Sequence, residues 1–401
     1  MTLAAAEKAF AEATDPSSSK LHAAILAGVD KNGKKIYSKT FGRMGIAPDA
    51  PPLKGDAVMK VASCTKLITS IAALQCVDRG LIGLDDSVFN VLPELSKLEV
   101  VSSDDEGKTL KLSPPNKPIT IRQLLTHSSG LAYGALSPLI VAYRNQNGLG
   151  ESESYPISGT VAECYSNPLA FHPGEGWVYG PGLDWAGQLV RRLNNNITLE
   201  QYFVDNIFKP VGAPAPYPTF NLSEHPELKA NLLECANRTA EGGLEPVSAP
   251  FGDMPKDEHG GSGLALTTDH YLAVQADLLS DSPKLLSKEM ISALFSPQLE
   301  EGSAAQKGLE AWSLIFAPMT GGEVGMPGVN YGLGGCLFTK GIPNTGTPPG
   351  TLMWGGFTNP VWQINREKGI AGWLGVQQLP PGDPTFVALG KIFWTDFWAT
   401  F

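Results

Sequence analysis

A single lysine inside a long apolar segment constrains the fold more than any other feature of this sequence. Residues 61–77 read VASCTKLITSIAALQCV, and Lys66 is the only charged residue between Lys60 and Asp78. The apolar positions 67, 68, 71, 74 and 77 follow helical spacing, and Gly80 ends the pattern. A helix this apolar is expected to be mostly buried, where an ammonium group is costly unless partners compensate it. The lysine therefore indicates a functional site enclosed by the rest of the fold.

Ser63 precedes this lysine by three residues, so an S-x-x-K motif stands at the start of the predicted helix. Residues three apart share a helix face, which directs Ser63 and Lys66 into the same space. The helix N-terminus also offers backbone N–H groups that can stabilise an oxyanion. A serine needs a base to act as a nucleophile, and lysine serves as one only when burial or a nearby cation lowers its pKa. The alternative is a helix-capping serine beside a solvated lysine, because the motif is common.

Cys64 is a second candidate nucleophile in the same segment. One residue along a helix turns the side chain by about 100°, which directs Cys64 away from Lys66. We therefore predict that Cys64 packs in the core.

Composition excludes several classes of partner. The net charge of the 401 residues is −10 and no run of Lys or Arg occurs, so a nucleic-acid partner is disfavoured. The longest apolar stretch, residues 67–77, is too short to span a membrane. Five widely spaced cysteines without a C-x-x-C motif favour neither a disulfide framework nor a zinc site. No signal peptide is visible at the N-terminus, so we expect a cytoplasmic protein with free thiols, no metal and no organic cofactor.

The two ends of the chain carry strand patterns, whereas the middle carries helical ones. Residues 21–30 and 34–42 flank an Asn32-Gly33 turn, and further strand-like stretches flank a turn at residues 366–369. We predict an α/β (α+β) fold with an antiparallel sheet built from both chain termini and an inserted helical region. Residues 1–60 and 310–401 form the sheet region and residues 61–309 the mostly helical region of a single interrupted fold. The active site is expected at their junction.

Four segments in chain order resemble one known superfamily. They are VMKVASCTKLITSIAALQCVDRGLIGLDD (58–86), ITIRQLLTHSSGL (119–131), LEQYFVDNIFKPVG (199–212) and GGSGLALTTDHYL (260–272). They are similar to the serine β-lactamase-related superfamily of class C β-lactamases, penicillin-binding proteins and family VIII esterases. The resemblance covers about residues 20–400. WVYGPGLDWAGQLV (177–190) is especially like the fungal branch that contains lovastatin esterases and the lovastatin acyltransferase.

The resemblance implies a β-lactamase-like fold and a third catalytic residue. Tyr179 occupies the position of the family's catalytic tyrosine, whose phenolate would accept the Ser63 proton while Lys66 keeps the pKa of the tyrosine low. The alternative for Tyr179 is a buried aromatic residue with a satisfied hydroxyl. The resemblance also places the oxyanion hole at the backbone N–H groups of Ser63 and Phe357.

Two positions depart from the family pattern. The asparagine expected two residues after the tyrosine is Pro181, which offers neither an N–H group nor a side-chain amide. The usual Lys-Thr-Gly motif is replaced by Trp354-Gly355-Gly356, which substitutes an apolar wall for a cation. Both changes disfavour β-lactam and peptide substrates and favour an apolar ester. The two glycines are expected to let this strand approach the substrate closely.

Other residues are weaker candidates. Tyr133 lies just after the SSGL turn and is predicted to bind substrate together with Trp354, Gly355 and Gly356, with core packing as an equal alternative. His127 invites a Ser-His pairing, but we expect it to support the fold. Asp85 and Asp86 are expected to end a turn. Four tryptophans are candidates for an aromatic pocket, with half of them expected in the core: Trp177, Trp185, Trp354 and Trp362.

The resulting prediction is a serine esterase that cleaves a hydrophobic carboxylic ester, such as a polyketide or statin side-chain ester, through a Ser63 acyl-enzyme. The alternative is an acyltransferase that moves an acyl group from a thioester or ester to a polyketide alcohol, and only this alternative calls for an acyl-carrier protein as partner. Trp354-Gly355-Gly356 resembles the esterase versions of the third motif, which favours hydrolysis. A β-lactamase is disfavoured by the departures above. A non-catalytic binding protein is disfavoured by the intact Ser63, Lys66 and Tyr179.

Overall fold

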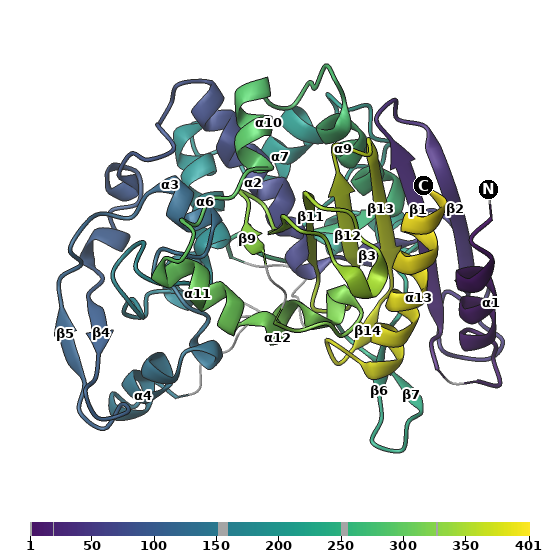
Figure 1. The fold of residues 1–401 in the computed structure, drawn as a ribbon, viewed down its shortest axis with the longest axis horizontal. Helices are drawn as coiled ribbons and strands as arrows, with labels where there is room; N and C mark the ends of the chain where they lie inside the picture. The colour runs from purple at the N-terminus through teal and green to yellow at the C-terminus, as the bar shows by residue number, and fades with distance from the viewer. Residues whose placement is uncertain (1, 19, 151–158, 250–255, 326–327) are drawn as a thin grey trace.

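The largest sheet of the molecule takes its strands from both ends of the chain. A computed structural model describes residues 2–18, 20–150, 159–249, 256–325 and 328–401. Within these residues this sheet has seven antiparallel strands in the order β2-β1-β13-β12-β11-β10-β9 (Figure 1). Its strands are β1 (Ala23–Asp30), β2 (Lys35–Gly42), β9 (Val329–Tyr331), β10 (Cys336–Phe338), β11 (Thr351–Gly355), β12 (Val361–Asn365) and β13 (Ile370–Gly375). The predicted fold class is confirmed, because the N-terminal strand β1 pairs directly with the C-terminal strand β13.

Both predicted hairpin turns are present in this sheet. The Asn32-Gly33 turn joins β1 to β2, and Gly33 has φ +78°, a conformation that glycine adopts without strain. The segment 366–369 joins β12 to β13. β1 is buried along nearly its whole length because it lies inside the sheet with helices on both faces.

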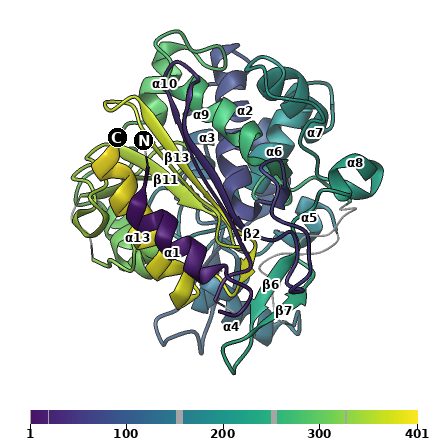
Figure 2. The same ribbon diagram turned by 90° about the vertical axis from the view of Figure 1, so that its right-hand side faces the viewer.

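Helices cover both faces of the sheet. On one face α1 (Ala4–Ala13) packs beside the predicted aromatic helix α13 (Pro384–Thr400), and Figure 2 shows α9 (Thr268–Leu279) on the opposite face. A Cβ atom on Gly28 of β1 would lie 2.6 Å from the Phe397 ring, and one on Gly372 of β13 would lie 2.7 Å from the Trp394 ring. These glycines let the aromatic side chains of α13 approach the strands closely.

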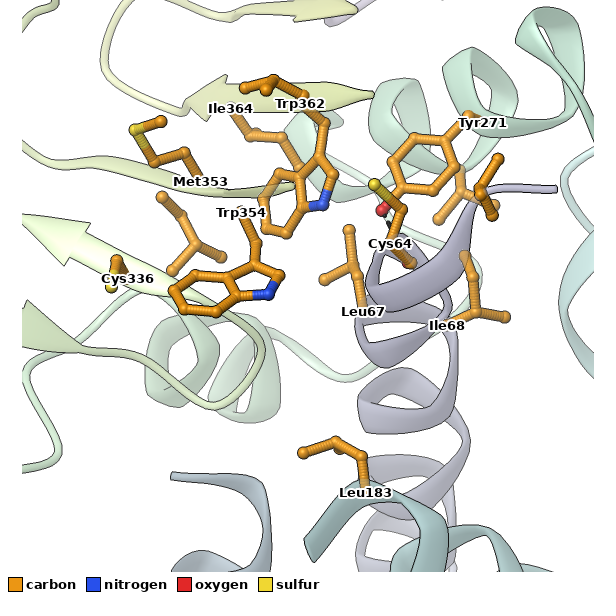
Figure 3. Packing of buried hydrophobic residues seen from close by; sticks show 14 of the residues in the cluster. Cys64, Leu67, Ile68, Leu183, Tyr271, Cys336, Met353, Trp354, Trp362 and Ile364 are labelled. Carbon is orange, nitrogen blue, oxygen red and sulfur yellow. Dashed lines mark hydrogen bonds between the residues drawn. The ribbon is translucent and has the colours of Figure 1, made fainter. Parts of the chain in front are cut away.

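The predicted helix around Lys66 is α2 (Thr65–Asp78), at the centre of the molecule. All its residues from Thr65 to Cys76 are buried, because α2 lies between α6 (Gly182–Leu193) and the sheet. Figure 3 shows Leu67 of α2 in one apolar cluster with Trp354 of β11 and Trp362 of β12. The helix that carries the buried lysine is therefore held by the inner strands of the sheet.

The remaining elements surround this centre. The other α-helices are α3 (Ile121–Leu125), α4 (Pro138–Gln146), α5 (Val161–Cys164), α7 (Leu199–Phe203), α8 (Pro226–Lys229), α10 (Lys288–Leu294), α11 (Ala304–Ala311) and α12 (Ser313–Phe316). Short strands pair outside the main sheet: β3 (Val58–Lys60) with β8 (Ala265–Thr267), β4 (Val100–Ser102) with β5 (Lys111–Ser113), and β6 (Cys235–Arg238) with β7 (Leu244–Val247) and β14 (Gln378–Leu379). In the part of the chain described, no helix is long and apolar enough to cross a membrane.

The division into a sheet region and a helical region remains a proposal. Its boundary at residues 309/310 falls inside α11, and β3 of the first segment pairs with β8 of the helical region. One apolar core also includes residues of both regions. We therefore propose the division as a description of a single interrupted fold, without separately folding units.

Candidate active site

Ser63 lies in a tight turn immediately before the central helix. The turn is a 3₁₀ helix, Ala62–Cys64, and the side chain of Ser63 is almost completely buried. Ala62 has φ +47°, in the left-handed region that alanine rarely adopts. Such strain persists only where the surrounding structure enforces it, and it often marks a functional site.

The ammonium group of Lys66 lies beside Ser63, and the residue is 2% exposed. Lys66 Nζ donates hydrogen bonds to Ser63 Oγ at 3.1 Å, to Tyr133 OH at 3.2 Å and to the carbonyl oxygen of Gly261 at 2.8 Å. The structure thus brings the two residues of the S-x-x-K motif together, with Ser63 in the 3₁₀ turn and Lys66 in the first turn of α2. It also supplies the partners that a buried lysine requires.

Tyr179 also contacts Ser63. Its hydroxyl donates to Ser63 Oγ at 2.8 Å and accepts a hydrogen bond from Trp354 Nε1 at 3.3 Å. Burial raises the pKa of Tyr179, against the lowering effect of its hydrogen bonds with Ser63 and Trp354. We predicted a low pKa maintained by Lys66, whose Nζ lies 4.7 Å from the centre of the Tyr179 ring. In the resting site burial dominates, so Tyr179 is a neutral phenol.

An apolar cavity of about 310 Å³ opens beside these residues. Most of its lining side chains are apolar, and Leu314 of α12 is 76% exposed. The cavity is lined by Ser63, Leu136, Tyr179, Leu314, Ile315, Pro318, Met319, Trp354, Gly355, Gly356, Phe357, Asn359, Val361, Pro381, Gly382 and Phe386. The predicted third motif and the predicted oxyanion-hole residues Ser63 and Phe357 therefore border one space.

The two glycines of the third motif have a structural reason in addition to the one we expected. A Cβ atom on Gly356 would lie 2.4 Å from the carbonyl oxygen of Val61, and one on Gly355 would lie 2.7 Å from Met319 Sδ. The glycines therefore allow β11 and the following residues to approach the turn before Ser63 and the side chain of Met319. Both glycines also line the cavity, so their close approach to a substrate stays a prediction.

The substitution Gly356→Ala should disturb this contact. The new methyl group would meet a backbone carbonyl, which moves only with the nucleophile turn, so we expect a loss of about 1–3 kcal/mol in unfolding free energy. We also expect kcat/KM to fall about tenfold or more, because the turn that positions Ser63 shifts. Urea denaturation and steady-state kinetics measure the two effects. Gly55→Ala is the control, since a Cβ there has open space around it, and equal behaviour of the two variants would contradict the argument.

Tyr133 lies beside Lys66 instead of facing the cavity. Its hydroxyl accepts from Lys66 and donates to Asp184 Oδ2 at 3.1 Å, and Tyr133 is not among the described residues that line the cavity. We predicted that it binds substrate. The structure places it one step further from the cavity, in the hydrogen-bond network behind the lysine.

Two titratable residues of this network, Asp184 and His259, were not among the predicted site residues. Asp184 is 0% exposed and accepts hydrogen bonds from Tyr133 and from the backbone N–H of Gly261, at 2.9 Å. His259 Nδ1 lies 3.6 Å from Asp184 Oδ1. A signal was available, because Asp184 interrupts the apolar sequence LDWAGQLV as Lys66 interrupts its own helix.

Two further candidates, His127 and Cys64, have structural roles. His127 is buried and accepts a hydrogen bond from the Gly180 N–H at 3.3 Å, and its ring centre lies 4.7 Å from that of Tyr179. Burial, with the charge of Lys66, lowers the pKa of His127, so the ring is neutral. Cys64 packs in the core, where its thiol donates to the Pro360 carbonyl at 3.7 Å (Figure 3). Burial raises the pKa of this thiol, which removes it as a rival nucleophile.

Of the candidate aspartates and tryptophans, which all lie within the part of the chain described, only one residue lines the cavity. Asp85 pairs with Arg122 at 2.7 Å, and Asp86 accepts the Gly83 N–H at 2.7 Å, as expected of residues in a turn. Of the four candidate tryptophans, only Trp354 is among the described residues that line the cavity. The other three are buried: Trp177, Trp185 and Trp362.

The sheet with an inserted helical region and the Ser-x-x-Lys pair at their junction define a class, the serine enzymes with a β-lactamase-like fold. The family model described as "Beta-lactamase" matches residues 13–391, so the chain belongs to the beta-lactamase family. Acyltransferase calJ of Penicillium decumbens is 45% identical over 376 residues, which cover 92% of this chain and 87% of that protein. Lovastatin esterase of Penicillium rubens is 34% identical over 92% of each chain.

A solved structure agrees with these relatives. The unliganded simvastatin synthase LovD of Aspergillus terreus matches with a TM-score of 0.85 and 30% identity, over 99% of this chain and 98% of that one. The predicted fungal branch is therefore confirmed. Its members include enzymes of both expected kinds, an esterase and acyltransferases, and this chain is an enzyme of that branch.

Proposed function

We propose that this enzyme is an acyltransferase that moves a small acyl group onto the hydroxyl of a polyketide-type alcohol through an acyl-enzyme on Ser63. The observation that carries the proposal is the contact of both Lys66 and Tyr179 with Ser63 Oγ at the edge of a mostly apolar cavity. Trp354 supports it, because an indole stands where a cation would bind the carboxylate of a β-lactam or peptide. The relatives named above act on statins or transfer acyl groups, which supports the same substrate class.

The first half-reaction forms the acyl-enzyme. Ser63 Oγ attacks the carbonyl carbon of a thioester or ester donor, and its proton passes to the Tyr179–Lys66 pair, which must first have lost one proton. The backbone N–H groups of Ser63 and Phe357 stabilise the oxyanion of the tetrahedral intermediate. The carbon–sulfur or carbon–oxygen bond of the donor then breaks, and the pair returns the proton to the leaving thiol or alcohol.

The second half-reaction uses the same groups in reverse. The acceptor hydroxyl gives its proton to the Tyr179–Lys66 pair and attacks the acyl-enzyme carbonyl, and Ser63 leaves with the proton returned. A cavity of about 310 Å³ lies at the lower end of the range for ligand sites, so donor and acceptor would occupy it in succession. This order predicts ping-pong kinetics.

Ester hydrolysis is the second candidate function. It uses the same residues, with water in place of the acceptor, and the 34% identity to lovastatin esterase favours it. The apolar lining of the cavity favours transfer, because it leaves few groups to bind a water molecule near the acyl-enzyme.

We further propose a thioester donor delivered by an acyl-carrier protein, and a cytoplasmic location. The exposed Leu314 at the cavity supports access by a bulky donor. None of the five cysteines, which all lie within the described residues, forms a disulfide, and this supports a reducing compartment.

A partition experiment tests transfer against hydrolysis. The enzyme is incubated with a butyryl thioester, with and without a bulky polyketide alcohol, and both butyrate and the butyryl ester are measured by mass spectrometry. We expect ester formation to exceed butyrate release about tenfold or more. The reason is that the apolar site around the acyl-enzyme admits an apolar acceptor more readily than water. If butyrate is released at the same rate at every acceptor concentration and no ester forms, the enzyme is an esterase.

A further inference from the structure

A buried carboxylate lies directly behind the lysine of the site, and none of the steps above uses it. Asp184 belongs to the first turn of α6 and is fully buried. Removal of a carboxylate from water is costly unless charges and hydrogen bonds compensate it. The groups that compensate this one are also the groups that contact Lys66.

We propose that Asp184 is a positioning residue that holds Lys66 against Ser63 through Tyr133 and the Gly261 peptide, and that His259 modulates the negative charge of this carboxylate. This inference rests on the proposed Ser63 acyl-enzyme and assigns a role to residues outside it.

The hydrogen bonds support the positioning role. Lys66 Nζ contacts Ser63 Oγ, Tyr133 OH and the Gly261 carbonyl oxygen. Asp184 accepts from Tyr133 OH at 3.1 Å and from the Gly261 N–H at 2.9 Å, so it orients two of these three partners of the lysine. A Cβ atom on Gly261 would lie 2.5 Å from Asp184 Oδ2, which shows how closely the loop packs on the carboxylate.

The charges support the modulating role. Burial is the main cause of the raised pKa of Tyr179, and the negative charge of Asp184 raises it further. Burial would lower the pKa of His259, but the neighbouring Asp184 carboxylate, together with the Gly159 backbone and the charge of Asp257, raises this pKa above its ordinary value. His259 Nδ1 lies 3.6 Å from Asp184 Oδ1, so a proton gained by this imidazole offsets part of the charge of Asp184. The titratable and charged groups that surround this pair are Lys66, Tyr133, Tyr165, Tyr179, Arg191 and Asp257.

A purely structural role for Asp184 would have a different consequence. An acidic residue in the first turn of a helix interacts favourably with the helix dipole, and its loss lowers stability. Such a loss would change the free energy of unfolding without moving the pH dependence of Ser63 reactivity. The pH profile therefore separates the two roles.

The test measures the rate at which a fluorophosphonate labels Ser63 between pH 6 and 10, with the adduct located by peptide mass spectrometry. In this reaction the Ser63 Oγ–P bond forms, fluoride leaves, and the serine proton passes to the Tyr179–Lys66 pair. For Asp184→Asn we expect the midpoint of the profile to move about one pH unit lower, because a negative charge near the pair is removed. The plateau rate should fall about tenfold or more, because two partners of the lysine lose their anchor.

Where the native imidazole is protonated, His259→Gln should shift the midpoint in the opposite direction, to higher pH, because the variant then lacks that positive charge and keeps the carboxylate. The control is Asp277→Asn, which removes another buried carboxylate that accepts the backbone N–H groups of Lys284 and Leu285. This control should leave the midpoint unchanged.

The outcomes are distinguishable. Opposite shifts in the two folded variants support the proposal, with folding checked by near-UV circular dichroism. Unshifted midpoints in both variants overturn it. If Asp184→Asn does not fold, His259→Gln decides alone, and an unshifted midpoint in that variant overturns the proposal. If native enzyme shows no labelling of Ser63 at any pH, the proposed function itself fails and this inference fails with it.

Discussion

Replacement of Ser63 by alanine should lower the acyl-transfer rate by about 10⁴-fold or more, because no other group can form the covalent intermediate. The strained left-handed conformation of the turn is at Ala62 and not at residue 63. Alanine at position 63 should therefore leave the fold intact. Intact-protein mass spectrometry after incubation with p-nitrophenyl butyrate checks the result. The native enzyme should gain one butyryl group and the variant none.

The matched control is Cys64→Ala in the neighbouring position. Cys64 packs against Pro360 and its thiol is held protonated by burial, so this variant should keep its activity within about threefold while it loses some stability from the small cavity. Turnover by Ser63→Ala, or loss of acylation in a folded Cys64→Ala variant, would show that the assignment of Ser63 as the nucleophile is wrong.

The substitution Tyr179→Phe should lower kcat by about 10²–10⁴-fold, the range for loss of a general acid–base group. Phenylalanine keeps the ring contacts with His127 and Trp354, but it removes the hydroxyl that donates to Ser63. Burial raises the pKa of Tyr179, so the Tyr179–Lys66 pair holds both protons near neutral pH. The fraction of enzyme in which the pair has lost one proton, the reactive form, increases with pH. The kcat/KM of the native enzyme should therefore rise with pH on the alkaline side of neutrality, and the profile of the variant should be flatter.

Tyr331→Phe is the matched control for this variant. Tyr331 is also buried, and its ring centre lies 5.8 Å from that of Trp354. We expect its activity and pH profile to stay close to those of the native enzyme. If Tyr179→Phe retains both its rate and the alkaline rise, then Lys66 alone is the base and the assignment of Tyr179 is wrong.

Local sequence patterns predicted much of the fold and the centre of the site. Apolar spacing indicated α2, the Asn32-Gly33 turn indicated the β1–β2 hairpin, and the three-residue interval placed Ser63 and Lys66 on one face. Tyr179 and the third motif came from the family resemblance, because nothing in their local sequence relates them to Ser63. Hydrolysis and transfer could not be separated in this way, since both reactions use the same residues.

For some predicted substrate-binding residues the structure shows contacts that the sequence did not indicate, and their role toward a substrate stays a prediction. Gly355 and Gly356 were assigned to the substrate, although in the structure Met319 and the Val61 carbonyl exclude larger side chains there. Tyr133 was assigned to the cavity, although its hydroxyl lies between Lys66 and Asp184. In each case the deciding contact comes from a segment distant in sequence.

The sequence by itself determined that one lysine must be buried beside a serine, because an apolar helix leaves Lys66 no path to water. Only the tertiary structure decided how that charge is compensated. The Gly261 carbonyl that accepts from Lys66 is 195 residues away along the chain, and Asp184, which holds the Gly261 N–H, comes from a third segment. Periodicity reports whether a side chain is buried, but long-range packing selects its neighbours. The charge network behind Ser63 is therefore a property of the folded chain.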